Sequence, residues 1–258
     1  MRTPLIVGNW KMFTTPAEAA DLATDISRRL DGFLGIAVAL AVPYTSLAVV
    51  GPILRGTGID LGAQDLHWED RGPYTGAISH GMLEALGCRY VLVGHSERRE
   101  HFGETDHQVS LKVLAALRGG LLPILCVGEK EGDRNAGRTR AVLRRQVSRA
   151  LEGIPAGSGR HLTVAYEPVW AVGTGRAASP GDASDAHQAI RRQLERLFGH
   201  EISRSVRVLY GGSVTPDNVQ GFSGESEVDG VLVGGASLRA PDFVRIVRGG
   251  WERRPIVG

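Results

Sequence analysis

The sequence has few cysteines, no long hydrophobic run and no excess of one charge, and each shortage excludes a class of protein. The 258 residues include only two cysteines, Cys88 and Cys126, both flanked by apolar segments. This usage fits free thiols in a reducing compartment better than a disulfide framework, and neither cysteine has the setting of a nucleophile. The eight histidines are scattered without the close pairing of metal ligands, so we expect no metal site.

The sequence supports neither a membrane nor a nucleic acid as a partner. The longest apolar run, from Phe33 to Val42, ends at Pro43 and is too short to span a bilayer. The first four residues lead directly into an apolar segment, which leaves no room for a signal peptide. The 30 basic and 28 acidic residues nearly cancel, with no basic block long enough for nucleic acid. We therefore expect a soluble, cytoplasmic protein whose partners are small molecules.

What the chain does contain is an eightfold alternation of apolar, strand-like runs with longer amphipathic segments. Such βα units predict parallel strands that are buried on both faces. At this length a single closed (β/α)8 barrel spanning residues 1–258 is the favoured α/β fold, and a doubly wound open sheet is the alternative. The predicted strands are 5–8, 36–42, 59–63, 90–93, 122–127, 162–166, 206–210 and 231–233. The predicted helices are 16–30, 45–54, 81–86, 106–117, 138–151, 184–198, 215–220 and 241–247.

In a closed barrel, the residues that follow the strands meet at one rim. Active sites of such barrels lie on this carboxyl-terminal rim, so polar residues and glycines after the strands are the candidates for function. We expect these residues to converge on one mouth although they are far apart in the chain: Asn9, Lys11, His95, Glu97, Glu167, Ser213, Gly234 and Gly235.

Glu167 is the strongest candidate for a catalytic base. It ends the sixth predicted strand and is followed by Pro168, Trp170 and the glycines Gly173 and Gly175, a composition typical of a hinged lid. A base beside a lid suits chemistry that excludes water, because closure strengthens the electrostatics inside and protects reactive intermediates. The alternative interpretation is a glycine-rich connector with a solvated glutamate.

Lys11 and His95 would supply charge and a hydrogen-bond donor at the same mouth. Lys11 is one of three lysines among the basic residues, and its compact ammonium would be a fixed cation, unless it is an ordinary surface lysine. We expect Ser96 to cap the next helix, whose partial positive charge would favour a neutral His95 imidazole. A half-buried structural histidine is the alternative. The glycines after the last two strands leave backbone N–H groups open to a phosphate.

Eight segments of the chain together resemble the triosephosphate isomerase family. They run in the family's order from the first strand to the last helix, so the resemblance covers nearly the whole sequence. The matching segments are 8–11, 62–64, 74–76, 93–99, 126–129, 165–175, 210–214 and 229–238.

The resemblance implies a reaction and a role for each candidate residue. Glu167 would move a proton between neighbouring carbons of dihydroxyacetone phosphate and glyceraldehyde 3-phosphate through an enediolate, a reaction of glycolysis and gluconeogenesis that needs no cofactor. His95, Lys11 and Asn9 would stabilise the enediolate oxygens, and Glu97 would have a secondary role. The phosphate would be held by Gly173, Ser213, Gly234 and Gly235.

The resemblance further implies a homodimer. The long segment from Gln64 to Ser79 would insert into a pocket of the partner subunit and brace the residues near Lys11 and His95. Ala77 and Asp65 stand where many family members have Glu and Asn, and the change at 77 removes an expected partner of Arg98 across the interface.

Two other functions stay open at this point. One is a related isomerase that acts on tetrulose phosphates, which the intact segment 9–11 and the lid disfavour. The other is a non-catalytic barrel that binds phosphorylated metabolites, which the joint presence of Lys11, His95 and Glu167 disfavours, because a binder needs no base. The second lid hinge, 176–178, also differs from the family's common pattern and would change opening kinetics more than chemistry.

Overall fold

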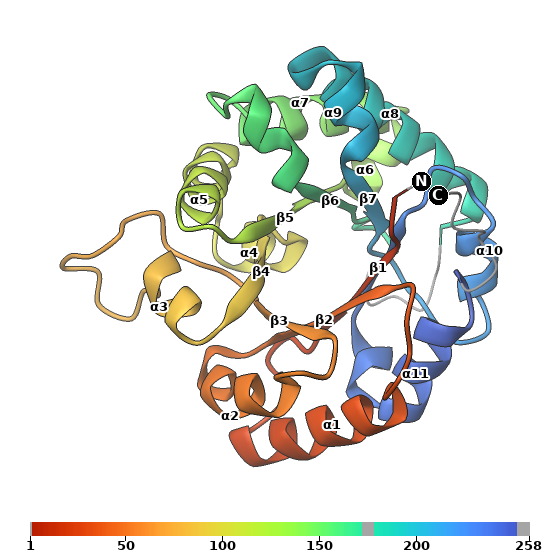
Figure 1. Cartoon of the computed structure of the whole chain (residues 1–258). Helices are drawn as coiled ribbons and strands as arrows, with labels where there is room; N and C mark the ends of the chain where they lie inside the picture. Colours follow the sequence, from red (N-terminus) through yellow and green to blue (C-terminus); the bar gives the residue numbers. More distant parts are fainter. Residues whose placement is uncertain (1, 172–177, 252–258) are drawn as a thin grey trace.

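Eight parallel strands close into a barrel in chain order, with helices packed around it (Figure 1). The computed structural model describes residues 2–171 and 178–251. The closed sheet confirms the predicted (β/α)8 barrel and rules out the open doubly wound sheet. The strands are β1 (Leu5–Asn9), β2 (Ala37–Val42), β3 (Ile59–Ala63), β4 (Cys88–Val93), β5 (Leu122–Val127), β6 (Thr163–Tyr166), β7 (Arg207–Tyr210) and β8 (Gly230–Val233).

The helices follow the predicted order, with local start signals where the sequence places them. Thr15 caps the first helix, its side chain accepting the Glu18 N–H while the Glu18 carboxylate accepts the Thr15 N–H. The longer helices are α1 (Pro16–Arg29), α2 (Tyr44–Leu54), α5 (Asp106–Arg118), α7 (Thr139–Ala150), α8 (Pro180–Phe198) and α11 (Ala240–Arg248). The shorter ones are α3 (His80–Ala85), α4 (Ser96–His101), α6 (Glu131–Asn135), α9 (His200–Ser205) and α10 (Val219–Ser223), with 3-10 turns η1 (Ala156–His161) and η2 (Gly235–Leu238).

Three differences from the predicted helices have local causes. The short helices α4, α6 and α9 were not predicted, because six residues or fewer are too few for an apolar period to show. Helix α8 begins four residues before the predicted 184, because Ser179 and Asp182 form a capping box around Pro180. Helix α10 begins at Val219 and not at Thr215, because reciprocal side-chain bonds between Thr215 and Asn218 close a turn there first.

The core has two layers, one inside the barrel and one between strands and helices. Alternate strand residues such as Val7 and Ala165 fill the barrel interior, and the intervening ones pack under the helices. Continuing this period of two by one step places Asn9 and Glu167 on the inward face, at the carboxyl ends of β1 and β6. The same alternation that builds the core therefore aims the candidate polar groups into the mouth.

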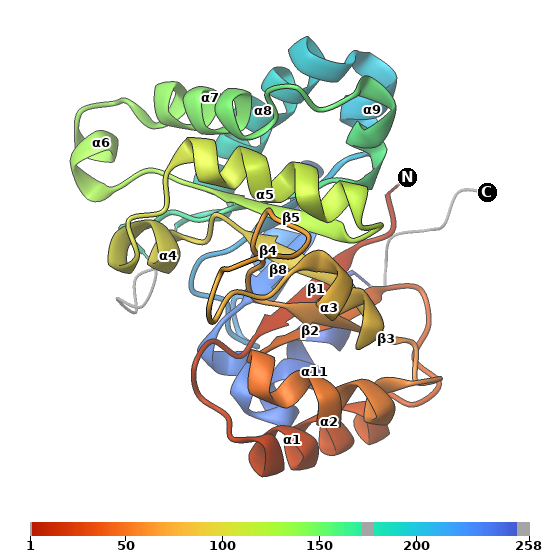
Figure 2. The same cartoon turned by 90° about the vertical axis from the view of Figure 1, so that its left-hand side faces the viewer.

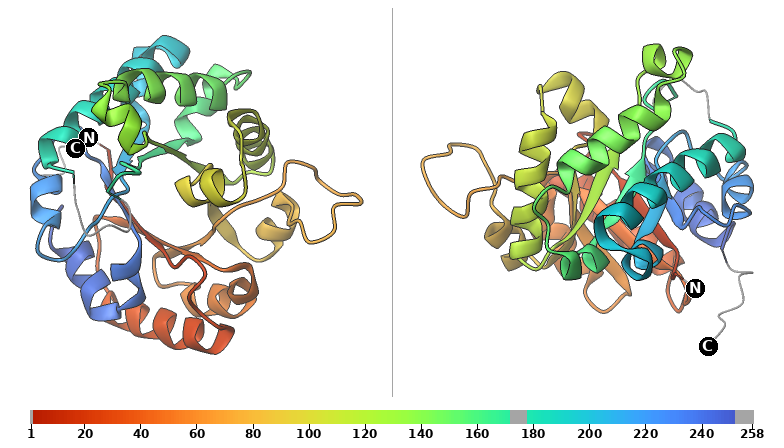
Figure 3. Two further views of the ribbon diagram at one scale, coloured as in Figure 1. Left: turned by 180° about the vertical axis from the view of Figure 1, so that it is seen from behind. Right: turned by 90° about the horizontal axis from the view of Figure 1, so that it is seen from above.

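The two ends of the barrel carry different elements. Figure 2 shows α4 and α6 at one end and the N-terminus with α9 at the opposite end. The segment between β3 and α3 projects beyond the barrel wall (Figure 3). Both cysteines are buried and free. No described helix is long and apolar enough to cross a membrane, and within residues 2–171 and 178–251 no three His, Cys, Asp or Glu side chains are grouped to hold a metal ion.

Candidate active site

The predicted mouth residues line one cavity at the carboxyl ends of the strands. This cavity has a volume of about 350 Å³. Of the predicted residues it is lined by Asn9, Lys11, His95, Glu167, Ser213, Gly234 and Gly235. Glu97 lies beside the cavity as the ion-pair partner of Lys11, and Gly173 lies outside the described residues. The topology thus brings together groups from both ends of the chain.

Glu167 is buried at the floor of this cavity and is held by two donors. Its Oε1 lies 2.8 Å from His95 Nε2, and its Oε2 accepts the backbone N–H of Ser96 at 2.9 Å. The sequence did not reveal this use of Ser96, which we expected to cap α4. The cap is His95, whose Nδ1 accepts the N–H of Glu97 at 3.3 Å, so the Ser96 N–H is left free for the carboxylate.

The hydrogen bonds fix the tautomer of His95. Because Nδ1 accepts an N–H, the ring carries its proton on Nε2, between the imidazole and Glu167. Burial raises the pKa of Glu167, but His95, the Ser96 N–H and Lys11 outweigh burial and lower it. Burial lowers the pKa of His95, but the Glu167 carboxylate outweighs burial and raises it. In this arrangement Glu167 is therefore an ionised carboxylate that rests against its hydrogen-bond donor His95.

Both the backbone and the ammonium of Lys11 are held in place by hydrogen bonds. Its φ of 51° lies in the left-handed region, the one non-glycine case among residues 2–171 and 178–251. The Lys11 N–H donates to Asn9 Oδ1 at 3.0 Å, and the Lys11 carbonyl accepts from Gln64 Nε2 at 2.8 Å. These two bonds stabilise a conformation that costs about 1–3 kcal/mol. The ammonium donates to Glu97 at 2.6 Å, which keeps it at the cavity wall.

Glycines let two polypeptide segments approach Glu167 closely. A Cβ on Gly128 would lie 1.6 Å from the Glu167 carbonyl oxygen, and one on Gly211 would lie 3.1 Å from Glu167 Cγ. Gly128 is therefore required for the position of Glu167, a role that the sequence alone did not suggest. Gly235, by contrast, faces open space and opens the 3-10 turn η2, so its backbone is accessible to a bound anion.

A buried carboxylate anchors the chain directly after Glu167. Glu129 Oε1 accepts from the Tyr166 hydroxyl at 3.0 Å and from Trp170 Nε1 at 2.9 Å. The Ser213 hydroxyl donates to the Ala171 carbonyl at 3.1 Å. These bonds fix the segment that leads into the predicted lid, whose residues 172–177 lie outside the described part of the chain.

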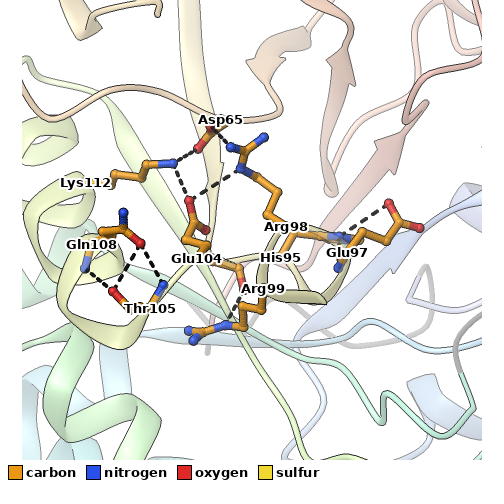
Figure 4. A network of polar contacts seen from close by, with 10 residues as sticks. Asp65, His95, Glu97, Arg98, Arg99, Glu104, Thr105, Gln108 and Lys112 are labelled. Carbon is orange, nitrogen blue, oxygen red and sulfur yellow. Dashed lines mark hydrogen bonds and ion pairs between the residues drawn. The ribbon is translucent and has the colours of Figure 1, made fainter. Parts of the chain in front are cut away.

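A second charged cluster lies beside α4, at the base of the projecting segment (Figure 4). Arg98 reaches Asp65 at 3.0 Å and Glu104 at 3.4 Å, while Lys112 reaches Asp65 at 2.6 Å and also pairs with Glu104. The loss of a carboxylate at Ala77 therefore leaves Arg98 with two acidic partners in its own chain. Burial raises the pKa of Asp65, although Lys112 and Arg98 oppose it.

The fold and the position of the mouth are those of the (β/α)8-barrel enzymes, whose active sites lie at the carboxyl ends of the strands. Within that class, the sequence pattern of the triosephosphate isomerase family matches residues 4–250, and this chain belongs to that family. It is an isomerase, and the resemblance seen in the sequence is confirmed.

Known relatives are similar over nearly their whole length. Triosephosphate isomerase of Moorella thermoacetica is 50% identical over 247 residues, covering 96% of this chain and 98% of the relative. That of Carboxydothermus hydrogenoformans is 47% identical, with 96% and 99% covered. The crystal structure of triosephosphate isomerase from Bartonella henselae superposes with a TM-score of 0.86 at 39% identity, covering 95% of this chain and 98% of that one.

Proposed function

We propose that this chain interconverts dihydroxyacetone phosphate and D-glyceraldehyde 3-phosphate, with Glu167 as the base that moves the proton. The observation that carries the proposal is the meeting of Glu167, His95 and Lys11 around one cavity. A carboxylate base, an N–H donor and an ammonium are the groups that an enediolate route requires, because the base removes a carbon-bound proton while negative charge develops on neighbouring oxygens. One proton moves between the two carbons and one between their oxygens, with no net oxidation or reduction, so the route needs no cofactor.

The roles of the polar groups follow from their contacts. To reach a substrate carbon, Glu167 leaves the Ser96 N–H and His95 Nε2, which frees Nε2–H to donate to a substrate oxygen. The departing carboxylate also removes the main influence that raises the His95 pKa, so that burial and Lys11, which lower the pKa, are opposed by Glu97 alone among the causes named. We expect the imidazole to be neutral when it faces the substrate, because burial disfavours its charged form. Asn9 and Lys11 complete the donor set, and Glu97 positions the ammonium.

The substrate phosphate is assigned to the glycine side of the cavity. Ser213, Gly234 and Gly235 line that side, and the exposed backbone at Gly235 suits an anion. Gly173, outside the described residues, would join them from the lid. Binding the non-reacting phosphate would supply free energy for lid closure, which protects the enediolate from water.

We further propose that residues 1–258 form one domain that acts as a homodimer in the cytoplasm. Met12, Phe13 and Phe102 are large apolar side chains with 95%, 66% and 71% of their surface exposed, and Tyr74 on the projecting segment is 44% exposed. Such exposure supports a partner surface. Deleting the loop tip around Tyr74 and Thr75 should yield monomers of low activity in sedimentation and rate assays. A fully active monomer would contradict the dimer proposal.

The test of the proposed reaction is Glu167→Gln, which keeps the size of the side chain and removes the base. We expect a loss of about 10²–10⁴-fold in kcat, since this is what a positioned base contributes. A coupled assay on both triose phosphates measures the loss, and retained binding of a phosphate analogue shows that the site is intact. Near-normal turnover would exclude Glu167 as the base, and faster turnover of erythrulose phosphates would favour the tetrulose phosphate alternative.

A further inference from the structure

A second polar cavity lies at the end of the barrel opposite the catalytic mouth. It has a volume of about 630 Å³, within the range of small-molecule sites. Its basic lining comes from Arg2 before β1, Arg160 in η1, Arg204 in α9 and Arg207 at the start of β7. All four positions precede or begin strands, so the cavity belongs to the end where Figure 2 shows the N-terminus and α9.

Two of the four guanidinium groups are fixed by the fold. Arg2 Nε contacts Asp229 at 2.7 Å, and its Nη1 donates to the Arg204 carbonyl at 2.8 Å. Arg207 Nη2 donates to the Tyr90 hydroxyl at 3.1 Å. Each still has N–H groups beyond these bonds, because a guanidinium carries five donors. The folded chain therefore holds two cations in place at the wall of the cavity.

The other two guanidinium groups are exposed and unpaired. Arg160 and Arg204 have no hydrogen-bond or ion-pair partner for their side chains within residues 2–171 and 178–251. Glu201 is the one acidic residue in the lining. Asp229, a buried acid that contacts Arg2, also pairs with Arg191 at 2.9 Å. The cavity thus concentrates positive charge in a chain whose formal net charge is only +2.

We propose that this cavity binds a small anion carrying two or more phosphate groups, at a site separate from the catalytic mouth. Planar guanidinium forks match phosphate oxygens in pairs, and four forks spread over separate elements suit an anion with more than one phosphate group. A bound polyphosphate would link the N-terminal segment, η1, α9 and β7. Because it binds only the folded chain, it would raise the thermal stability of the protein.

The probe is inorganic tripolyphosphate, added to the full chain without divalent cations at constant ionic strength and compared with inorganic phosphate. Calorimetric titration gives the dissociation constant, and thermal unfolding gives the shift in Tm. Both measurements are repeated with an excess of the triose phosphates, which fill the catalytic mouth. We expect tripolyphosphate to bind more tightly than phosphate, to raise Tm, and to do so whether or not the mouth is filled.

The variant is Arg160→Gln with Arg204→Gln, and the matched control is Arg144→Gln with Arg192→Gln, which removes equal charge from exposed positions on α7 and α8. We expect the first pair to weaken tripolyphosphate binding at least tenfold with unchanged isomerase kinetics, and the control pair to bind like the parent. Equal affinity in all three proteins, or binding abolished by the triose phosphates, would overturn the proposal. Isomerase activity is measured separately, so failure of this site is distinguishable from failure of the proposed reaction.

Discussion

Two charge networks begin at neighbouring residues of α4 and differ in how far they are buried, and Figure 4 shows the one that begins at Arg98. Glu97 faces the mouth and pairs with Lys11, and both side chains remain partly exposed at 39% and 22%. Arg98 faces the base of the projecting segment, where two cations and two carboxylates pair with one another and Glu104 and Lys112 are almost fully buried. One turn of helix therefore supports an open network, which can accept a substrate, and a closed one, whose cations and carboxylates pair with one another although Glu104 Oε2 has no hydrogen-bond partner among the described residues.

The two regions also differ in the pKa shifts of their carboxylates. Burial acts on both Glu167 and Asp65, yet the pKa of Glu167 is lowered and that of Asp65 is raised. At the mouth, the His95 N–H, the Ser96 N–H and a nearby ammonium are all directed at one carboxylate. At the base of the projecting segment, two cations are shared by two carboxylates, so burial prevails at Asp65. Paired charge alone does not lower a pKa: Asp65 has two cationic partners, but it shares them with Glu104, whose charge raises the Asp65 pKa further.

Breaking the closed network should give the largest change in stability. Lys112→Met leaves Asp65 and Glu104 with Arg98 alone, and removing one partner of a buried pair costs about 3–5 kcal/mol. Urea unfolding measures the loss in the free energy of unfolding, and activity per folded molecule should stay close to normal. Lys130→Met is the control, because Lys130 is exposed and lies 3.9 Å from Glu100, a pair worth less than about 1 kcal/mol. Equal stability of the two variants would show that the network is not closed.

Breaking the open network should spare stability and reduce activity. Lys11→Met removes one preorganised cation from the mouth, and losing such a group typically costs about 10²–10³-fold in rate. The partly exposed Lys11–Glu97 pair contributes less than about 1 kcal/mol to folding. Steady-state kinetics and urea unfolding of one preparation give both numbers. A variant that unfolds easily yet keeps its kcat/KM would reverse the comparison between the two networks.

The sequence predicts the barrel and the identity of the mouth residues for the same physical reason. Strand period and strand order fix where a side chain points, so Asn9 and Glu167 could be placed before any coordinates. Strand period and strand order do not predict the local backbone conformation. The left-handed conformation of Lys11 depends on Gln64, which lies 53 residues further along the chain. The capping role of His95 was likewise hidden, because Ser is the more common cap and nothing in the segment excludes it.

The charge at the base of the projecting segment shows another limit of sequence reasoning. The sequence indicated that Ala77 removes a carboxylate partner of Arg98, and it also contains Asp65, but only the folded chain brings Asp65 within 3.0 Å of that guanidinium. The carboxylate missing at Ala77 and the carboxylate present at Asp65 can be related to each other only through tertiary contacts. The 3.4 Å contact of Arg98 with Glu104, six residues further along the chain, was also not predicted, and it depends on the local turn that ends α4.

The smallest expected effect is a difference in the direction in which two carboxylates make the free energy of unfolding change with pH. Glu167 has a folded pKa below its ordinary 4.5, so its ionisation contributes stability that is present above that value and lost as the pH falls through the folded pKa. Asp65 has a folded pKa above its ordinary 3.8, so its contribution is fully present below 3.8 and lost as the pH rises through the folded pKa. Each slope is limited to one proton, about 1.4 kcal/mol per pH unit.

Unfolding free energies of the parent chain, Glu167→Gln and Asp65→Asn between pH 3 and pH 6 measure these signs, with the range chosen around the two ordinary values of 4.5 and 3.8. On acidification the advantage of the parent over Glu167→Gln should shrink, while its stability relative to Asp65→Asn should improve. Slopes of the same sign would mean that the neighbouring donors and cations shift the pKa values of both carboxylates in the same direction. Opposite slopes would show that α4 separates a carboxylate kept ionised for proton transfer from one whose charge is disfavoured by burial.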